Sequence, residues 1–258
     1  MPAPENRFKS RLAAGETLIG CWVALADPYV AEITAAAGFD WLLIDGEHAP
    51  NDLRSIMAQL RVVEASASAP VVRLPMGETW AIKQALDIGV QSLLIPMVET
   101  AQDARRLVRA VRYPPQGNRG VGAGLARASG FSAIPDYLQT ADDQVWLGIQ
   151  IETRAGLAAI DDILAVEGVN GVFIGPADLS ADMGHLGEPR HPDVLAAISG
   201  ATRRIAAAGK APGIIWTDAG HAAEAIADGA RFVATAIDVL GYGAAIRDAA
   251  RSGMALKP

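Results

Sequence analysis

The sequence has little cysteine, because Cys21 is the only one among 258 residues. One cysteine cannot form an internal disulfide, which agrees with a reducing compartment, and we expect Cys21 to pack in the core. The first residues contain no apolar signal region, and no later apolar run approaches the roughly 18 residues that a membrane span needs. The sequence therefore predicts a cytoplasmic protein that does not bind membranes.

Positive charge is also scarce. The chain has 22 Lys and Arg residues against 29 Asp and Glu residues, which gives a net charge of −7 at pH 7. Basic residues gather only in short pairs, such as Arg105-Arg106 and Arg203-Arg204. A nucleic-acid-binding surface needs a basic patch or stripe, so nucleic acid is not an expected partner. A small molecule or another protein is expected instead.

Apolar residues are plentiful at 51% of the chain, enough to bury a sizeable core in one domain over residues 1–258. Short apolar runs alternate with alanine-rich stretches of helical spacing, which is typical of βα units around a parallel sheet. Strands are expected at residues 19–25, 41–47, 70–74, 92–97, 145–152, 171–175, 212–216 and 232–237. Helices are expected near residues 28–38, 51–66, 79–88, 101–112, 154–166, 193–208, 218–228 and 239–252. This pattern predicts an α/β fold, a single (β/α)8 TIM barrel, whose floor an N-terminal helix at residues 6–14 closes.

A doubly wound sheet is the alternative fold. It needs a glycine-rich phosphate loop after the first strand, but residues 26–30 read Ala-Asp-Pro-Tyr-Val. The glycine-rich stretch at residues 117–124 follows a Pro-Pro turn instead of a strand, so it does not indicate nucleotide binding. Arg119 within it leaves open a contact with an anion or with another subunit. The long connections at residues 113–144 and 176–192 are typical of functional loops.

Two acidic residues stand where a barrel of this kind places its chemistry, at the carboxyl ends of the strands. Glu152 ends the fifth expected strand, and Asp178 follows the sixth. Adjacent strands run about 5 Å apart, so both carboxylates can converge on one hard cation such as Mg²⁺ or Mn²⁺. The alternative is that Glu152 caps the helix that follows it.

A second polar group follows the second and third strands. Asp45, Glu47 and His48 lie within four residues, and Arg73 ends the neighbouring strand. The histidine can exchange a proton near neutral pH, and the arginine can hold a developing oxyanion or a substrate carboxylate. The alternative is structural, with Asp45 paired to Arg73, Glu47 solvated and His48 capping the next helix.

Lysine is informative by its absence from the barrel mouth. The four lysines are Lys9, Lys83, Lys210 and Lys257, and none is placed at the end of a strand where it could form a Schiff base. Cys21 lies inside a strand without a neighbouring base. A metal is then the remaining electrophile for carbonyl chemistry.

Several motifs in this order resemble the HpcH/HpaI family of class II, metal-dependent pyruvate aldolases, over almost the whole chain. The most specific pieces are Trp-Leu-Leu-Ile-Asp-Gly-Glu-His-Ala-Pro-Asn at residues 41–51, Arg73, Gly-Asn-Arg-Gly-Val-Gly at 117–122, Gln-Ile-Glu at 150–152 and Phe-Ile-Gly-Pro-Ala-Asp-Leu-Ser at 173–180. The resemblance implies a carbon–carbon lyase that joins a 2-oxoacid to an aldehyde through a metal-stabilised enolate, or reverses that reaction.

The resemblance also implies roles for individual residues. The implied metal ligands are Glu152 and Asp178, the implied 2-oxoacid contacts are Gln150, Ala177 and Asp178, and the implied catalytic residues are His48 as acid/base, Arg73 at the transition state and Asp87 beside the histidine. It further implies a homo-oligomer, a hexamer, with the helix at residues 239–252 exchanged between subunits. Neither metal nor arginine selects the aldehyde, so Trp22, Val121, Ile215 and Trp216 are expected to do so.

Asp87 is the residue for which the resemblance and the barrel geometry conflict. Strands run toward the active face and helices run back, so Asp87, near the end of the third barrel helix, is expected at the floor. It should not reach His48 of its own barrel. Pairing with His48 across a subunit interface reconciles the two, whereas a solvated turn residue is the simpler alternative.

Two further classes of protein remain open at this point. A lyase of the citrate or malyl-CoA type would share the barrel and metal, but this acidic chain shows no basic patch for the phosphates of CoA. A non-catalytic 2-oxoacid sensor would have no need of His48 beside Arg73.

Overall fold

The computed structural model describes residues 1–257 and contains eight parallel strands closed into one barrel. Each strand pairs with the next along the chain, and the last pairs with the first. The strands are β1 (Leu18–Val23), β2 (Trp41–Asp45), β3 (Ala69–Arg73), β4 (Ser92–Ile95), β5 (Trp146–Ile151), β6 (Gly171–Ile174), β7 (Ala211–Ile215) and β8 (Phe232–Ile237). The predicted (β/α)8 barrel is confirmed, and the doubly wound alternative is wrong.

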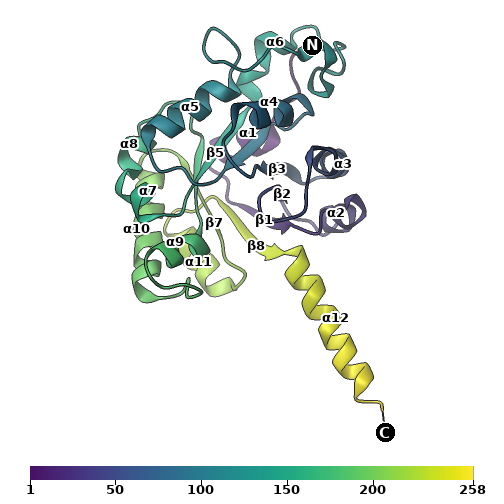
Figure 1. Cartoon of the computed structure of the whole chain (residues 1–258), viewed down its shortest axis with the longest axis vertical. Helices are drawn as coiled ribbons and strands as arrows, with labels where there is room; N and C mark the ends of the chain where they lie inside the picture. The colour runs from purple at the N-terminus through teal and green to yellow at the C-terminus, as the bar shows by residue number, and fades with distance from the viewer. Residues whose placement is uncertain (258) are drawn as a thin grey trace.

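The helices pack around the strands, except for the last one, which extends away from the barrel (Figure 1). They are α1 (Arg7–Ala13), α2 (Pro28–Ala35), α3 (Leu53–Glu64), α4 (Thr79–Asp87), α5 (Ala101–Val111), α6 (Tyr137–Thr140), α7 (Arg154–Ala158), α8 (Ile160–Leu164), α9 (Pro176–Asp182), α10 (Pro192–Ala207), α11 (Ala219–Ala227) and α12 (Asp238–Met254). The helix expected at 154–166 is two short helices, because Ala159 has a non-helical backbone between them. Of these described helices, none is long and apolar enough to cross a membrane.

Local sequence signals set several helix starts. Asp27 accepts hydrogen bonds from the N–H groups of Tyr29 and Val30 at the start of α2. Asp52 and Ser55 form a reciprocal capping box at the start of α3. His48 therefore does not cap α3, and that alternative role is wrong. Thr153, not Glu152, caps α7, which leaves the Glu152 carboxylate free for another role.

Large aromatic side chains fill the barrel interior next to glycines on neighbouring strands. A Cβ at Gly20 would lie 2.2 Å from the Trp41 indole, and a Cβ at Gly213 would lie 2.1 Å from the Phe232 ring. Phe8 of α1 packs against Trp41 and Phe232 from below, with ring centroids 5.7 and 5.8 Å apart. These contacts confirm that the N-terminal helix closes the floor, and they leave the polar side chains at the opposite end.

The last helix, α12, extends away from the barrel (Figure 1). None of its residues is buried, and its exposed apolar side chains include Leu240, Tyr242, Ile246 and Met254. Asp238 fixes its start, because Oδ1 accepts a hydrogen bond of 2.8 Å from the N–H of Ala24 after β1.

Candidate active site

Arg73 and Asp45 form a buried, two-point ion pair at the ends of β3 and β2. The strand register places the two residues opposite each other. Nε of Arg73 donates to Oδ1 of Asp45 at 2.8 Å, and Nη2 donates to Oδ2 at 2.7 Å. Burial opposes ionisation of Asp45, but the hydrogen bonds and charge of Arg73 hold its pKa below the ordinary value. The pairing expected as the structural alternative is present, and it orients the guanidinium.

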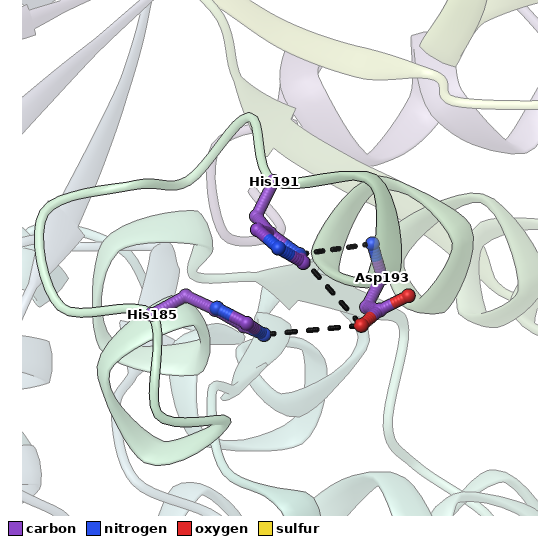
Figure 2. Close-up of side chains that lie close together, drawn as sticks. All are labelled: His185, His191 and Asp193. Carbon is purple, nitrogen blue, oxygen red and sulfur yellow. Dashed lines mark hydrogen bonds and ion pairs between the residues drawn. The ribbon is translucent and has the colours of Figure 1, made fainter.

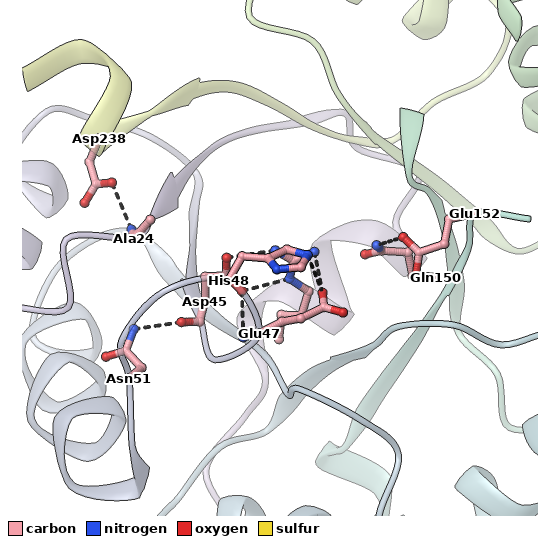
Figure 3. A network of polar contacts seen from close by, with 9 residues as sticks. Ala24, Asp45, Glu47, His48, Asn51, Gln150, Glu152 and Asp238 are labelled. Carbon is pink, nitrogen blue, oxygen red and sulfur yellow. Dashed lines mark hydrogen bonds and ion pairs between the residues drawn. The ribbon is translucent and has the colours of Figure 1, made fainter. Parts of the chain in front are cut away.

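Glu47 and His48 continue this group toward solvent (Figure 3). Oε2 of Glu47 lies 2.7 Å from Nη1 of Arg73 and 3.7 Å from Nε2 of His48. The Glu47 side chain is 15% exposed, so the structural alternative in which Glu47 is solvated is wrong on this point, whereas the His48 side chain is 67% exposed. The buried acids and arginine thus present an accessible imidazole at the mouth.

Glu152 lies one residue beyond β5 and is 2% exposed. Its Oε1 accepts a hydrogen bond of 2.8 Å from the N–H of Met97, and its Oε2 accepts one from Nε2 of Gln150. Met97 has a φ of 56°, which is strained for a side chain of its size and which ends the expected strand 92–97 early. The strained turn supplies the backbone donor that fixes Glu152.

The charges of neighbouring carboxylates act on Glu152 and Glu47 at this mouth. Burial raises the pKa of Glu152, and the charges of Asp178 and Glu47 raise it further. Burial likewise raises the pKa of Glu47; Arg73 opposes that shift, and Asp178 adds to it. Asp178 lies in the first turn of α9 and is exposed. The structure therefore brings Glu152, Glu47 and Asp178 within electrostatic reach of each other.

Gly175 makes room for Glu152, a requirement that the sequence reading missed. It follows β6, next to β5. A Cβ at Gly175 would lie 2.5 Å from Oε2 of Glu152 and 2.9 Å from its Cβ. The motif Phe-Ile-Gly-Pro-Ala-Asp contained the signal, because glycine permits such a close approach.

An apolar cavity of about 710 Å³ lies at the start of α9, the helix that carries Asp178, and its wall includes Ala177, Ile215, Trp216 and Leu240. Trp22 is not among its lining residues. It is buried in the barrel, with the Arg73 guanidinium carbon 5.1 Å from its ring centroid.

Comparison with known proteins decides the family. Residues 18–243 match the family model described as HpcH/HpaI aldolase/citrate lyase. The chain belongs to this family. The resemblance drawn from the motifs is confirmed.

Similar family members carry aldolase names. A hydroxypyruvate/pyruvate aldolase of Roseovarius nubinhibens is 61% identical over 240 residues, which cover 93% of each chain. A 4-hydroxy-2-oxo-heptane-1,7-dioate aldolase of Escherichia coli is 54% identical over 234 residues, 91% of this chain and 89% of the relative. The predicted carbon–carbon lyase and its pyruvate-aldolase type are confirmed.

Solved structures agree with the family. An HpcH/HpaI aldolase/citrate lyase family protein from Burkholderia cenocepacia has a TM-score of 0.91 and 42% identity, over 96% of this chain and 99% of that one. A citrate lyase beta subunit from M. tuberculosis, complexed with oxaloacetate and magnesium, has a TM-score of 0.58 and 18% identity, over 88% of this chain and 93% of that one. The second likeness extends to the fold alone.

Asp87 ends α4 next to a buried arginine of the family motif Gly-Asn-Arg-Gly-Val-Gly. Nη2 of Arg119 donates to Oδ1 of Asp87 at 3.1 Å, and the Arg119 side chain is 1% exposed. Leu86 and Arg119 line a cavity with Asn6 near the floor helix, as the barrel geometry predicts for this end of α4. Asp87 is therefore paired with Arg119 in its own chain, and the alternative of a solvated turn residue is wrong.

Lys9, Lys83, Lys210 and Cys21 lie away from the polar side chains described at the barrel mouth. Lys9 and Lys210 donate to backbone carbonyls of residues 143–145 and 166–169, and Lys83 lies on α4. Cys21 is buried in β1, and burial raises its pKa to about 12. A thiol with such a pKa is protonated at neutral pH and is a poor nucleophile.

Proposed function

We propose that this chain catalyses the reversible aldol reaction between pyruvate or hydroxypyruvate and an aldehyde, and that the reaction needs Mg²⁺ or Mn²⁺, with Co²⁺ as a further candidate. The observation that carries the proposal is the placement of two shielded carboxylates, Glu152 and Glu47, at one barrel mouth with Arg73, and with Asp178 in the first turn of α9. Relatives that are 61% and 54% identical bear the names of such aldolases.

Glu152 and Asp178 would hold the metal. Carboxylate oxygens suit a hard divalent cation, which usually keeps other positions for water and substrate. The residues fit such an ion, because a cation offsets both the burial of Glu152 and the repulsion between neighbouring carboxylates. When bound, it would withdraw electron density from the keto group of the 2-oxoacid and acidify the C3 protons.

Gln150, Ala177 and Asp178 would contact the 2-oxoacid. Oε1 of Gln150 is buried without a hydrogen-bond partner among the described residues, because its amide nitrogen is the atom that faces Glu152. A buried polar atom of this kind costs free energy until a ligand or water satisfies it. The small side chain of Ala177 leaves the start of α9 open to the 2-oxoacid.

Arg73 would stabilise negative charge on the keto oxygen of the 2-oxoacid. A guanidinium carries more N–H donors than the contacts with Asp45 and Glu47 use. The remaining donors are held in a fixed direction by the two-point pair, so they need little reorganisation as charge develops.

His48 would transfer the proton of the new hydroxyl group. In the direction of addition, the 2-oxoacid releases a C3 proton to water, its carbanion attacks the aldehyde carbon, and the aldehyde oxygen takes a proton from His48 directly or through a water, so that no net proton is gained or lost. Cleavage returns that proton to His48. The 67% exposure of the imidazole gives it access to bulk water for proton exchange.

Trp22 and Ile215 are proposed to shape the substrate pocket. Ile215 lines the apolar cavity where an aldehyde chain would extend, whereas Trp22 packs beneath the Arg73 guanidinium. The acceptor would then be chosen by the size and shape of apolar surface.

We further propose a homo-oligomer, a hexamer, in which α12 is exchanged and Asp87 reaches His48 of a neighbouring subunit. The unburied apolar face of α12 and the floor position of Asp87 in its own barrel support this arrangement. Cytoplasmic location stays a prediction from the sequence.

The test of the proposed function is product formation. The protein is incubated with Mn²⁺, pyruvate or hydroxypyruvate, and a panel of short aldehydes, and new carbon–carbon bonds are detected by mass spectrometry. We expect aldol products with the wild-type chain and none with Glu152→Gln. A reaction that requires a CoA thioester would indicate a citrate-type lyase, and 2-oxoacid binding without any product would indicate a sensor.

A further inference from the structure

A second group of metal-binding side chains lies outside the active site, on the connection between α9 and α10 (Figure 2). Nε2 of His185 is 3.9 Å from Oδ2 of Asp193, and Nδ1 of His191 is 3.8 Å from the same oxygen. The three ligand atoms all lie within 4.8 Å of one another. We propose that His185, His191 and Asp193 form a site for Zn²⁺, separate from the proposed active-site metal.

The backbone already holds the three residues near one another. The N–H of His185 donates to the carbonyl of Ser180 at 2.7 Å, which ties it to the end of α9. The N–H of Glu188 donates to the carbonyl of His185, and the N–H of His191 donates to the carbonyl of Glu188, each at 2.9 Å. Asp193 lies in the first turn of the 16-residue helix α10. The site therefore needs little loop ordering before an ion binds.

The ligand types favour zinc over the cation proposed for Glu152. Two imidazole nitrogens and one carboxylate oxygen suit a borderline ion such as Zn²⁺, whereas Mg²⁺ prefers oxygen ligands throughout. Tetrahedral zinc with bonds of about 2.0–2.1 Å separates its ligand atoms by roughly 3.3 Å. The observed separations of 3.8 and 3.9 Å require a closure of about half an ångström.

The side chains must move for this closure, and Nδ1 of His191 must also leave the N–H of Asp193, from which it accepts a hydrogen bond of 3.3 Å at the start of α10. The two imidazole rings stack with centroids 3.5 Å apart and 13° between their planes, so both must turn for their lone pairs to converge. The side chains of His185 and His191 are 26% and 30% exposed, and that of Asp193 is 74% exposed. Among residues 1–257, the ion pairs of Asp193 are with these two imidazoles alone, while the neighbouring Arg190 pairs with Asp218.

Binding at this site would fix one wall of the apolar cavity at the barrel mouth. Residues 187–192 line that cavity together with Ile215 and Trp216. His185 precedes this stretch, and Asp193 follows it. An ion that joins its two ends would therefore restrain the loop without touching Glu152 or Asp178.

Equilibrium dialysis against low-micromolar Zn²⁺, followed by metal analysis, tests the site in the full chain. The four proteins are wild type, Glu152→Gln, His185→Phe and the double variant. The phenylalanine keeps a ring that can stack on His191 but removes a ligand. His221→Phe is the matched control, because His221 also pairs with an aspartate, Asp218, outside the proposed site.

We expect the loss of the imidazole ligand in His185→Phe to weaken zinc affinity at this site at least about 10-fold. At low-micromolar Zn²⁺ the variant should therefore bind one zinc ion fewer per chain than wild type. The same difference should separate the double variant from Glu152→Gln, and His221→Phe should match wild type. Asp193→Asn should reproduce the loss. Zinc binding that is unchanged by both His185→Phe and Asp193→Asn would overturn the site, whatever the outcome for Glu152 and aldolase activity.

Hydrogen exchange then tests the restraint on the loop. In the Glu152→Gln background, Zn²⁺ should slow amide exchange in residues 184–192, and His185→Phe should abolish that protection. Equal exchange with and without Zn²⁺ in the Glu152→Gln protein would show that the ion does not restrain the cavity wall.

Discussion

Arg73 and Asp45, from neighbouring strands, are joined by two parallel hydrogen bonds of 2.8 and 2.7 Å at the barrel mouth. The planar guanidinium matches the carboxylate at both ends, so its direction is fixed. A lysine ammonium, which is a point charge on a flexible side chain, cannot make the same two-point contact. The pair therefore explains how an arginine at the end of β3 can be positioned before substrate arrives.

Replacing Arg73 tests its proposed role in the transition state. Arg73→Ala should lower kcat by roughly 10²–10³, as expected for the loss of an oxyanion donor. Arg73→Lys should restore little of this activity, because the two-point geometry is lost. Steady-state kinetics separate the alternatives, since a raised KM with unchanged kcat would make Arg73 a binding residue alone.

The ion pair between Asp45 and Arg73 predicts how the free energy of unfolding depends on pH. The folded-state pKa of Asp45 is lowered, so its stabilising contribution is present above the unfolded pKa of about 3.9 and is lost as pH falls through the lower folded pKa. Asp45→Asn should reduce the free energy of unfolding by about 3 kcal/mol at neutral pH. Urea unfolding at fixed protein concentration should show that this difference narrows below about pH 4.

Exposed Asp162 supplies the control for this series. Asp162→Asn should change the free energy of unfolding little at any pH. A deficit in Asp45→Asn that stays constant down to acid pH would mean that the carboxylate charge is not its cause.

Gly175→Ala tests whether the space beside Glu152 matters. The new Cβ would lie 2.5 Å from Oε2 of Glu152, so the carboxylate must move. We expect affinity for the catalytic metal to fall at least about 10-fold. Gly200→Ala is the matched control, since no heavy atom lies within 4 Å of its new Cβ and alanine favours the helix. Metal titration that shows equal affinity in both variants would contradict the account.

Mixed oligomers test the pairing of Asp87 with His48 between subunits. His48→Ala and Asp87→Asn chains are co-assembled, so that some interfaces regain one intact pair. Activity should rise above that of either parent. No recovery in verified mixed oligomers, or near-normal activity of Asp87→Asn alone, would show that Asp87 does not serve His48 in trans.

The barrel and the polar residues of its mouth could be predicted from the sequence because both depend on local order. Apolar runs of strand length mark the strands of the successive βα units, and the polar residues at the end of each run fall at the active face. Glu152, His48 and Arg73 were identified in this way. The ends of all strands but the last were placed one or two residues late, and at Met97 the reason is that apolar residues continue where the backbone leaves the ladder.

Contacts between distant segments account for what the sequence could not predict. The N–H of Met97 binds Glu152, and Arg119 binds Asp87, across 55 and 32 residues of sequence. Neither partner carries a local signal for the other. The sequence left open whether Glu47 is solvated, because its partial burial against Arg73 depends on how the closed barrel brings the two strands together.

Glu152 and Asp178 are proposed to hold a divalent cation that would acidify the C3 protons of the 2-oxoacid. Mass spectrometry of pyruvate kept in D₂O with the protein and no aldehyde tests this proposal most directly. We expect deuterium uptake at C3 that stops on chelation, returns with Mg²⁺, Mn²⁺ or Co²⁺, and is absent in Glu152→Gln. Uptake that persists in the metal-free protein, together with a pyruvate–lysine adduct trapped by borohydride, would show that a lysine and not a metal activates the 2-oxoacid.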